Sequence, residues 1–459
     1  MDGLFGKALF VGGGLAAVEY LRRRAAAPAT PRYSPWERRP YREFEKRVLI
    51  VGGGFGGYTA ARNLCRRLGD RDDVGVMVIS RDNFFTFWPM LAGVISSDVE
   101  TRNVAQPLRR SLIAHGSSFR RAELEGVDPE RGVVSASGVE IPYDHLVLAL
   151  GAEPSYFGIP GVRENCISMT SIETAERIRN RVIERYEEII LRRGAVPEGK
   201  LTFVVIGGGA TGVETAAELH GLVHDVLPPD YPNIDPNSVR IVLVDRNEEV
   251  LKELDPSLRR AARKKLADMR VEVINNTKAS EVTAEKVVLE DGREILSENV
   301  IWTAGARASE TVDRLGLPAD ERKGLTVDAC MRVSGHENIW AIGDCAANVD
   351  AEGNAVPPNA QAASQGGEAV AENVLAAIDG RPLSAFEYRS MGQLVELGSQ
   401  FAVNDIMGFR FSGFLASLFW RATYLFKLKG PQNRFRIATD WLIDLFYHPS
   451  VTQIRGRGS

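Results

Sequence analysis

The chain has 459 residues, of which 44% are hydrophobic and 25% charged, and its formal net charge is −4 at pH 7. This length allows two or three domains with a sizeable core, and the small negative charge argues against nucleic acid as a partner. The four cysteines are widely spaced and form no C-x-x-C motif. They therefore exclude a local redox disulfide and give no zinc site, so no bound metal is expected.

The first element in chain order is an apolar stretch from Leu4 to Leu21, which Lys7 and Glu19 interrupt. A membrane span needs about 20 uninterrupted apolar residues. The stretch therefore favours an interfacial helix or a disordered leader, and a membrane anchor is the alternative. The Ala-, Pro- and Arg-rich residues 25–40 that follow are typical of a linker.

Two glycine-rich fingerprints are the most informative motifs. Each follows a run of β-forming residues and opens a helical stretch, the context in which G-x-G-x-x-G binds a dinucleotide. The first glycine permits a tight turn, the second lets pyrophosphate approach the backbone, and the third lets helix and strand pack closely. The helix N-terminus adds free N–H groups and a positive dipole. The glycines are Gly52, Gly54 and Gly57 in the first fingerprint and Gly207, Gly209 and Gly212 in the second.

The residue that follows the second strand of each unit indicates how the adenosine ribose is bound. In the first unit the predicted strand at residues 74–79 leads to Ser80, whose hydroxyl can hydrogen-bond a ribose where most such units have an acid. In the second unit residues 241–244 lead to Asp245, which favours NADH, while Arg246 leaves NADPH open. Together the motifs predict an α/β flavoprotein with two Rossmann-like dinucleotide-binding domains.

The remaining elements fit this duplicated plan. After the second fingerprint the chain is expected to return to the first domain through a strand at residues 301–305. A later strand at residues 339–344 ends in Asp344, at the sheet edge where doubly wound folds bind ligands. Its carboxylate can accept hydrogen bonds from a ribityl chain, and a helix N-cap is the alternative. The other expected elements are a helix at 174–193, strands at 271–274 and 287–289, and a hairpin turn at Asp291-Gly292.

These motifs together resemble those of type II NADH:quinone oxidoreductases, the single-subunit NADH dehydrogenases that pump no protons, over nearly all of residues 46–450. The most specific is Ala360-Gln361-Ala362-Ala363-Ser364-Gln365, which is similar to the family's A-Q-x-A-x-Q quinone motif. The resemblance also covers residues 83–91, 178–181 and 302–305. It implies non-covalent FAD, NADH as hydride donor and a membrane quinone as acceptor.

The resemblance also implies a role for each motif residue. FAD contacts fall on the first fingerprint and Asp344, and NADH contacts on the second fingerprint and Asp245. Glu214 falls on an acid near the nicotinamide and the flavin, where the helix dipole would stabilise it and it could hold the carboxamide. Gln361 and Gln365 share a helix face and fall on glutamines that border the quinone, where an amide can donate and accept. An ordinary helix carboxylate and solvated helix polars are the respective alternatives.

The C-terminal region predicts a membrane-docking segment. Residues 410–436 contain six basic residues and no acid, and their apolar side chains recur at helical spacing, as do those at residues 441–446. Neither stretch reaches spanning length. Aromatic and basic residues on one amphipathic stretch suit a helix lying on an anionic bilayer surface, and a homodimer interface is the alternative use. The expected location is the cell membrane, bound peripherally at its cytoplasmic face.

The expected organisation is a leader (1–45), a FAD-binding domain in two parts (46–160 and 300–385), an inserted NADH-binding domain (161–299) and a C-terminal docking segment (386–459). The cofactor would carry the redox chemistry while the protein orients it. Two rival functions remain. A sulfide:quinone oxidoreductase shares the fold but would need Cys166 and Cys345 beside the flavin. A NADH-sensing signalling flavoprotein is the other.

Overall fold

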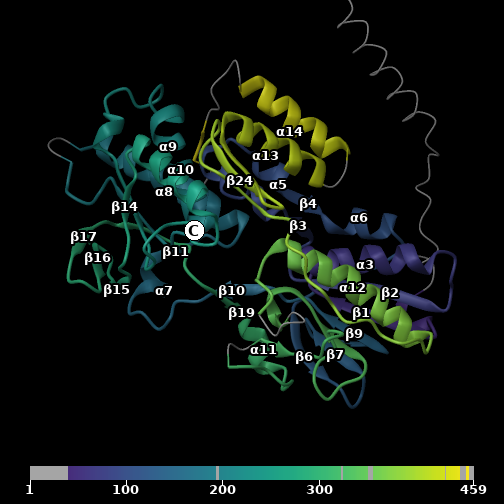
Figure 1. The fold of residues 1–459 in the computed structure, drawn as a ribbon. Helices are drawn as coiled ribbons and strands as arrows, with labels where there is room; N and C mark the ends of the chain where they lie inside the picture. The colour runs from purple at the N-terminus through teal and green to yellow at the C-terminus, as the bar shows by residue number, and fades with distance from the viewer. Residues whose placement is uncertain are drawn as a thin grey trace, which may run out of the picture.

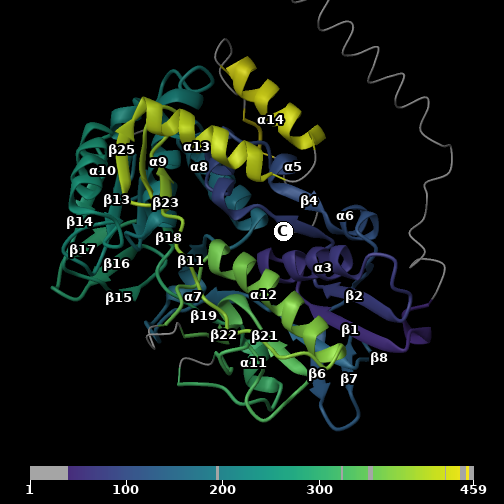
Figure 2. The same cartoon turned by 45° about the vertical axis from the view of Figure 1, so that its right-hand side comes forward.

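The structure is a computed structural model that describes residues 40–192, 196–321, 324–349, 355–428, 431–444 and 451–453. The predicted apolar stretch Leu4–Leu21 lies outside the described residues, as does most of the linker. Figures 1 and 2 show two sheets, each flanked by helices, with the C-terminal helices α13 and α14 lying above the junction between them.

The strand of the first fingerprint forms the centre of a parallel sheet. The sheet has five strands in the order β21–β9–β1–β2–β5. Val48, Leu49 and Ile50 of β1 are fully buried, as expected for a parallel strand that is covered on both faces. Helices α3 and α12 pack side by side on one face. The bounds are β1 Lys46–Val51, α3 Phe55–Leu68, β2 Val74–Ser80, β5 Ser118–Arg121, β9 His145–Leu148, β21 Ile339–Ala341 and α12 Ala360–Ile378.

Smaller elements surround this sheet. A three-stranded antiparallel sheet, β6–β7–β8, lies at its lower side in Figure 1, and short helices and strands follow β2. Their bounds are β3 Phe84–Thr86, α4 Gly93–Ser96, α5 Thr101–Val104, β4 Ala105–Pro107, α6 Leu108–Ala114, β6 Leu124–Asp128, β7 Val133–Ala136, β8 Val139–Pro142, α11 Glu310–Arg314, β20 Leu325–Thr326 and β22 Ala346–Ala347.

The second fingerprint builds a second parallel sheet, with strand order β11–β18–β12–β13–β14 and the antiparallel strands β15–β16–β17 beside it. The hairpin turn predicted at Asp291-Gly292 is confirmed, with Gly292 at φ +85° between β16 and β17. The bounds are α7 Val162–Asn165, β11 Cys166–Ser168, α8 Ile172–Ile190, β12 Thr202–Ile206, α9 Ala210–Gly221, β13 Arg240–Val244, α10 Pro256–Asp268, β14 Glu272–Ile274, β15 Ala279–Val282, β16 Lys286–Leu289, β17 Glu294–Leu296 and β18 Asn299–Trp302.

The strand expected to return the chain to the first domain belongs instead to the second sheet. β18 pairs in parallel with β11 and β12, and the Thr303 hydroxyl after it donates toward the carbonyl oxygens of Ile206 and Gly207. The second unit therefore needs this strand to complete its own sheet. The antiparallel pair β10 (Ala152–Pro154) and β19 (Ala306–Ala308) makes the connection between the two sheets. We accordingly propose that the inserted domain extends through β18.

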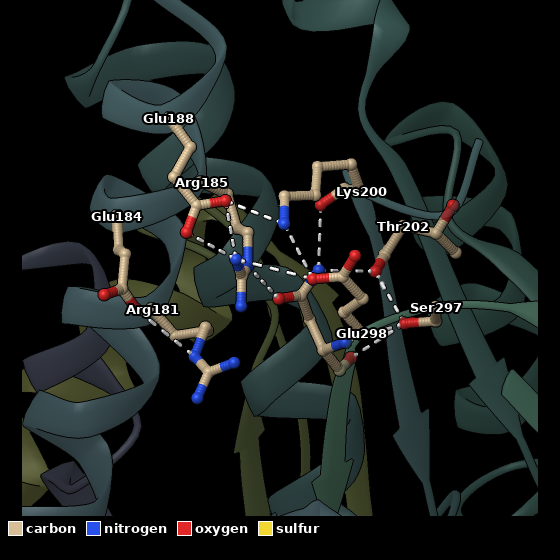
Figure 3. Close-up of polar contacts among 9 residues, drawn as sticks. Arg181, Glu184, Arg185, Glu188, Lys200, Thr202, Ser297 and Glu298 are labelled. Atoms are coloured by element: carbon tan, nitrogen blue, oxygen red, sulfur yellow. Dashed lines mark hydrogen bonds and ion pairs between the residues drawn. The ribbon is translucent and has the colours of Figure 1, made fainter. Parts of the chain in front are cut away.

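A cluster of acidic and basic side chains in ion pairs connects α8 to the second sheet (Figure 3). Lys200 Nζ lies 2.7 Å from a Glu188 oxygen and 2.8 Å from a Glu298 oxygen, and Arg185 Nη1 lies 2.7 Å from Glu188. The Arg185 and Lys200 side chains are only 8% and 10% exposed. Buried cations of this kind are tolerated because each one is paired.

The C-terminal segment covers both parts of the fold. A three-stranded antiparallel sheet, β23–β24–β25, contacts α9 and α10 of the second sheet, and α14 contacts α5 beside the first. Within the described residues no helix is both long enough and apolar enough to cross a bilayer. The bounds are β23 Gln393–Glu396, β24 Ala402–Ile406, β25 Phe409–Gly413, α13 Phe414–Lys427 and α14 Pro431–Asp444.

Candidate active site

A large cavity lies where the two sheets and the C-terminal segment meet. Its volume is about 1450 Å³, and it is lined by the second fingerprint, the start of α12, the chain before β23 and the end of α13. A cavity of this size can take a nucleotide and a second ligand. Five of the predicted site residues line it: Gly207, Gly209, Asp245, Gln361 and Gln365.

Both fingerprints have the backbone geometry that a dinucleotide needs. Gly52 and Gly207 have φ of +112° and +118°, values that residues other than glycine rarely adopt. Added side chains at Gly57 and Gly212 would collide with the carbonyl oxygens of Gly52 and Gly207, so each helix can start only if these positions lack a Cβ.

The second glycine of each fingerprint, Gly54 and Gly209, is the N-cap of its helix. A Cβ built there would meet nothing within 4 Å, and no side chain caps either helix. The N–H groups of the first turn of α3 and α9 are thus left available for phosphate oxygens.

Asp245 sits at the carboxyl end of β13 and is 7% exposed. Its carboxylate accepts hydrogen bonds from the Gly208 N–H and, at 2.7 Å, from the Asn247 N–H. These bonds fix the carboxylate against the fingerprint loop. The Asn247 side-chain amide also donates to it, at 2.6 Å. Because a carboxylate can accept about four hydrogen bonds, about one position remains for a ribose hydroxyl.

The first fingerprint fits FAD. Its three motif glycines do not line the large cavity, but Phe55 between them does, as do Thr59 and Arg62 farther along α3. Ser80 ends β2 beside Gly53, as a ribose contact requires. Asp344 is half-buried, burial raises the pKa of its carboxyl group, and no described residue hydrogen-bonds to it. A half-buried carboxylate that no described residue hydrogen-bonds can accept hydrogen bonds from the hydroxyls of a ribityl chain. The helix N-cap alternative is wrong, because Ile342 occupies the N-cap position.

Glu214 lies away from the wall of the large cavity. It is on α9, where its Oε1 accepts a hydrogen bond of 3.3 Å from the Glu396 N–H. Burial raises the pKa of Glu214 to about 8, with the nearby Glu218 adding to the shift. Desolvation therefore favours the protonated form of Glu214, in opposition to the helix dipole, which would favour the ionised form.

The two glutamines of the quinone motif share a helix face as predicted, and both hold a neighbouring chain segment. Gln361 donates to the Gly392 carbonyl at 2.7 Å and accepts from the Met391 N–H at 3.0 Å. Gln365 makes the same pair of bonds with Arg389, at 2.8 and 3.0 Å. Both amides are therefore held by hydrogen bonds to the protein backbone and not by solvent alone. Each amide keeps one N–H and one lone pair for a ligand in the cavity.

Tyr424 and Lys427 were not predicted as site residues from the sequence, which indicated Lys427 only as one of the basic residues of the docking segment. Both line the large cavity. Burial, with Glu214 nearby, raises the pKa of the Tyr424 phenol, and burial lowers the pKa of Lys427. With the buried Trp420 they are spaced at i, i+4 and i+7 on α13, a helical face that the sequence could have revealed.

The cysteines give no support to sulfide chemistry. Cys345 is fully buried and Cys166 is half-buried in a different sheet, at the start of β11. Burial raises the pKa of Cys345 to about 11 and that of Cys166 to about 12. Neither is a thiolate at neutral pH, and only the thiolate is an effective nucleophile.

Comparisons with known proteins agree with this site. The profile of the pyridine nucleotide-disulphide oxidoreductase family matches residues 46–367, and that of the NDH2 C-terminal domain matches residues 391–448. The chain is 31% identical to the type II NADH:quinone oxidoreductase of Haemophilus influenzae, over 79% of this chain and 87% of that protein. It is 30% identical to the enzyme of that name from Mycobacterium tuberculosis, over 90% of each.

The fold is also that of solved relatives. NDH2 from Plasmodium falciparum superposes with a TM-score of 0.80 at 20% identity, covering 89% of this chain and all of that one. A sulfide:quinone oxidoreductase from Aquifex aeolicus shares the fold with a TM-score of 0.67. The chain belongs to the pyridine nucleotide-disulphide oxidoreductase family and, within it, to the type II NADH:quinone oxidoreductases. It is a FAD-dependent NADH dehydrogenase with a quinone as acceptor, as the motifs predicted.

The raised pKa of Glu214 makes stability depend on pH. Between the ordinary carboxyl value of 4.5 and about 8, the folded protein holds a proton that the unfolded chain has released. Stability therefore falls as pH rises through this window. In the FAD-loaded Glu214→Gln variant, the melting temperature should fall less steeply with rising pH than in wild type. Above pH 8 the variant should be more stable than wild type. Exposed Glu372→Gln should keep the wild-type slope, and an equal slope in Glu214→Gln would contradict the assignment.

Proposed function

We propose that NADH and quinone both use the large cavity, which adjoins the FAD site. One observation carries this proposal: the NADH fingerprint with Asp245 and the quinone motif with Gln361 and Gln365 line the same 1450 Å³ space. FAD, when bound, supplies the two-electron chemistry between hydride donor and quinone. The chain's own residues bind and orient the substrates and exclude water. Such a site needs no nucleophilic side chain.

The NADH half of the cavity is built around Asp245. Its carboxylate, held by the loop N–H groups and the Asn247 amide, keeps about one acceptor position for a hydroxyl of an adenosine ribose. A 2′-phosphate at that position would bring a second negative charge against the carboxylate. Arg246 also lines the cavity and is the neighbouring cation that could offset this repulsion. The geometry favours NADH over NADPH.

Asp245→Ala should raise the KM for NADH and remove the preference for NADH over NADPH. A lost ribose contact costs about 1–3 kcal/mol. The ratio of kcat/KM for the two donors is the readout, because disorder of the loop alone would weaken both donors equally. Asp291→Ala, on the surface hairpin, should leave the ratio unchanged. Equal use of both donors by the wild-type protein would refute the role of Asp245.

The quinone half is built around the start of α12 and the inner face of α13. Gln361 and Gln365 can each offer a remaining N–H to a quinone carbonyl oxygen and a lone pair to the quinol hydroxyl. They also hold residues 389–392, which form part of the cavity wall. Loss of either amide should therefore disturb the acceptor end of the cavity more than the donor end.

Gln361→Ala and Gln365→Ala should slow reoxidation of the flavin by quinone and leave its reduction by NADH nearly unchanged. Stopped-flow absorbance of the flavin separates the two steps. The matched control is Gln400→Ala at an exposed position, which should behave like wild type in both. A variant slowed mainly in reduction by NADH would remove these residues from the quinone end.

The C-terminal segment exposes a surface suited to peripheral membrane docking. Its basic residues should contribute less to binding of an anionic bilayer than the sequence indicated. Arg421 is half-buried and ion-paired with Asp98 and Glu396, so little of its charge is left for anionic lipid. Arg434 donates to the carbonyl oxygens of Phe426 and Leu428 at 2.6 and 2.9 Å. The large exposed apolar side chains here are Phe409, Phe414, Leu415, Leu418, Phe419, Phe426, Phe435, Leu442 and Ile443. Apolar burial should dominate docking.

Replacement of Phe414, Leu415 and Leu418 by serine should release the protein from lipid vesicles. Each large side chain contributes about 1.5–3 kcal/mol when it leaves water. The loss should appear on neutral and anionic vesicles alike and persist in salt. The assay uses protein lacking residues 1–39. Ile190→Ser with Leu191→Ser, at exposed positions of the second sheet's α8 end, is the control.

Wild-type binding by the triple variant would reject docking through this face. If the same face instead forms a homodimer, the triple variant should shift from dimer to monomer in analytical ultracentrifugation without lipid.

A further inference from the structure

Two turns at the large cavity carry apolar residues in a backbone conformation that such residues rarely adopt. Phe157 and Met407 each precede a glycine, and both residues of each pair have positive φ. The values are +51° and +70° for Phe157-Gly158 and +52° and +89° for Met407-Gly408. A turn in which both central residues are left-handed prefers Asn-Gly or Asp-Gly, because a bulky side chain is crowded by its own backbone there.

A third turn of this kind shows what the fold carries elsewhere. Ser137-Gly138 connects β7 to β8 with φ of +46° and +73°, and serine is a small polar residue of the type found in turns. It does not line the large cavity, whereas Phe157 and Met407 both do. Of the three such turns among the described residues, the two with an apolar residue are therefore the two at the cavity.

The two apolar side chains are also exposed. Phe157 is 60% exposed and Met407 is 84% exposed. A single exposed apolar side chain is ordinary, but here it coincides with an unfavourable backbone conformation at the same residue. Strained residues persist mainly where a functional site needs them. The coincidence at both turns therefore indicates that a ligand in the cavity covers Phe157 and Met407 when it binds.

Phe157 lies beside the residues that follow β18. Its ring rests on Gly305, where an added Cβ would collide with the ring. The preceding residue, Ala304, adjoins Gly207, since a Cβ built on Gly207 would lie 2.8 Å from the Ala304 nitrogen. Phe157 is thus next to the first turn of the NADH fingerprint, on the side of β18.

The strand order identifies which half of NADH reaches this side. β12, which carries the fingerprint, lies between β18 and β13. Asp245 follows β13, so adenosine binds on that side of the pyrophosphate. A dinucleotide lies across the crevice of such a sheet, with its pyrophosphate at the fingerprint. The nicotinamide half must therefore extend over β18, toward Phe157.

Met407 lies on the opposite side, near the adenosine half. It is at the turn of the β24–β25 hairpin, and this hairpin packs against α10. Arg410 Nη1 of the hairpin lies 2.8 Å from an oxygen of Asp255, the N-cap of α10. The loop from Asp245 to α10 lines the cavity through residues 251–253. The hairpin is therefore held beside the loop that follows the ribose-binding carboxylate.

We propose that Phe157 and Met407 contact NADH directly, Phe157 at the nicotinamide half and Met407 at the adenosine half. Binding of NADH covers both apolar side chains and so removes their surface from water. At the nicotinamide end the Phe157 ring also excludes water from the place where hydride leaves. The inference rests on the proposed binding of NADH in the large cavity.

Phe157→Asn and Met407→Asn test the proposal, because asparagine accepts a left-handed backbone but offers no apolar surface. The measurement is calorimetric titration of the oxidised, FAD-loaded protein with NAD⁺ and, separately, with ADP, which has no nicotinamide. Phe157→Asn should weaken NAD⁺ binding by about 5–30-fold, the effect of losing a partly covered aromatic side chain, and leave ADP binding unchanged. Met407→Asn should weaken the binding of both ligands.

The melting temperature separates ligand contact from a role in folding. Asparagine relieves the backbone strain, and this relief offsets the few contacts of an exposed side chain. Both variants should therefore melt at or above the wild-type temperature while they bind NAD⁺ more weakly. Phe157→Tyr keeps the ring and should recover the affinity for NAD⁺. Ser137→Asn, in the matching turn outside the cavity, should change neither affinity.

Wild-type affinity of Phe157→Asn for NAD⁺, or of Met407→Asn for ADP, would overturn the proposal. A melting temperature that falls together with the affinity would also overturn it, because the residue would then act through folding. Asp245→Ala separates this failure from failure of the proposed function. If Asp245→Ala weakens NAD⁺ binding and the two asparagine variants do not, only the contacts of Phe157 and Met407 are rejected. If Asp245→Ala also binds NAD⁺ like wild type, binding of NADH in the large cavity is rejected.

Discussion

Close contact between each fingerprint helix and the strand before it is the constraint on which the rest of the structure depends. A carbonyl oxygen of the first glycine occupies the space where the third glycine would carry a Cβ, at Gly52 with Gly57 and at Gly207 with Gly212. The helix must therefore start directly above its strand, with its first N–H groups at the edge where dinucleotides bind. For α9 the same placement carries Glu214 and Glu218 toward the C-terminal segment.

The C-terminal segment forms part of the wall of the large cavity, in addition to its proposed role in membrane docking. One face of α13 carries the buried Trp420 and also Tyr424 and Lys427, which line the large cavity, while Leu415 and Leu418 are exposed on another face. A single helix thus contributes to the acceptor end of the cavity and presents the proposed membrane surface. This arrangement would place the quinone entrance close to the bilayer from which a quinone comes.

Local features of the fold were predictable from the sequence because their physical cause is local. Positive φ at Gly52 and Gly207, the buried strands and the Asp291-Gly292 hairpin follow from residue types within a few positions. Features that depend on residues far apart in the chain were not predictable in this way. The sequence of β18 is typical of a strand, but no nearby residue indicates that this strand pairs with β12. Pairing between distant strands had to come from the structure.

In the candidate site, too, residue types were predictable from the sequence, while contacts between distant residues were not. The sequence identified Asp245, Gln361 and Gln365, and all three line the cavity. It could not show that the two glutamines bind the backbone of residues 389–392, nor that Arg421, on an amphipathic stretch, pairs with Asp98, which lies 323 positions earlier. The raised pKa of Glu214 likewise depends on burial by elements remote in the chain.

This chain alone should perform both half-reactions, from NADH to FAD and from FAD to quinone, at one cavity. Sequential anaerobic mixing in a stopped-flow spectrometer tests it most directly, with FAD-loaded protein, NADH and then a water-soluble quinone in the absence of lipid. We expect NADH to bleach the flavin absorbance and the quinone to restore it within the turnover time. Bleaching that quinone cannot reverse, or no bleaching by NADH, would contradict the claim.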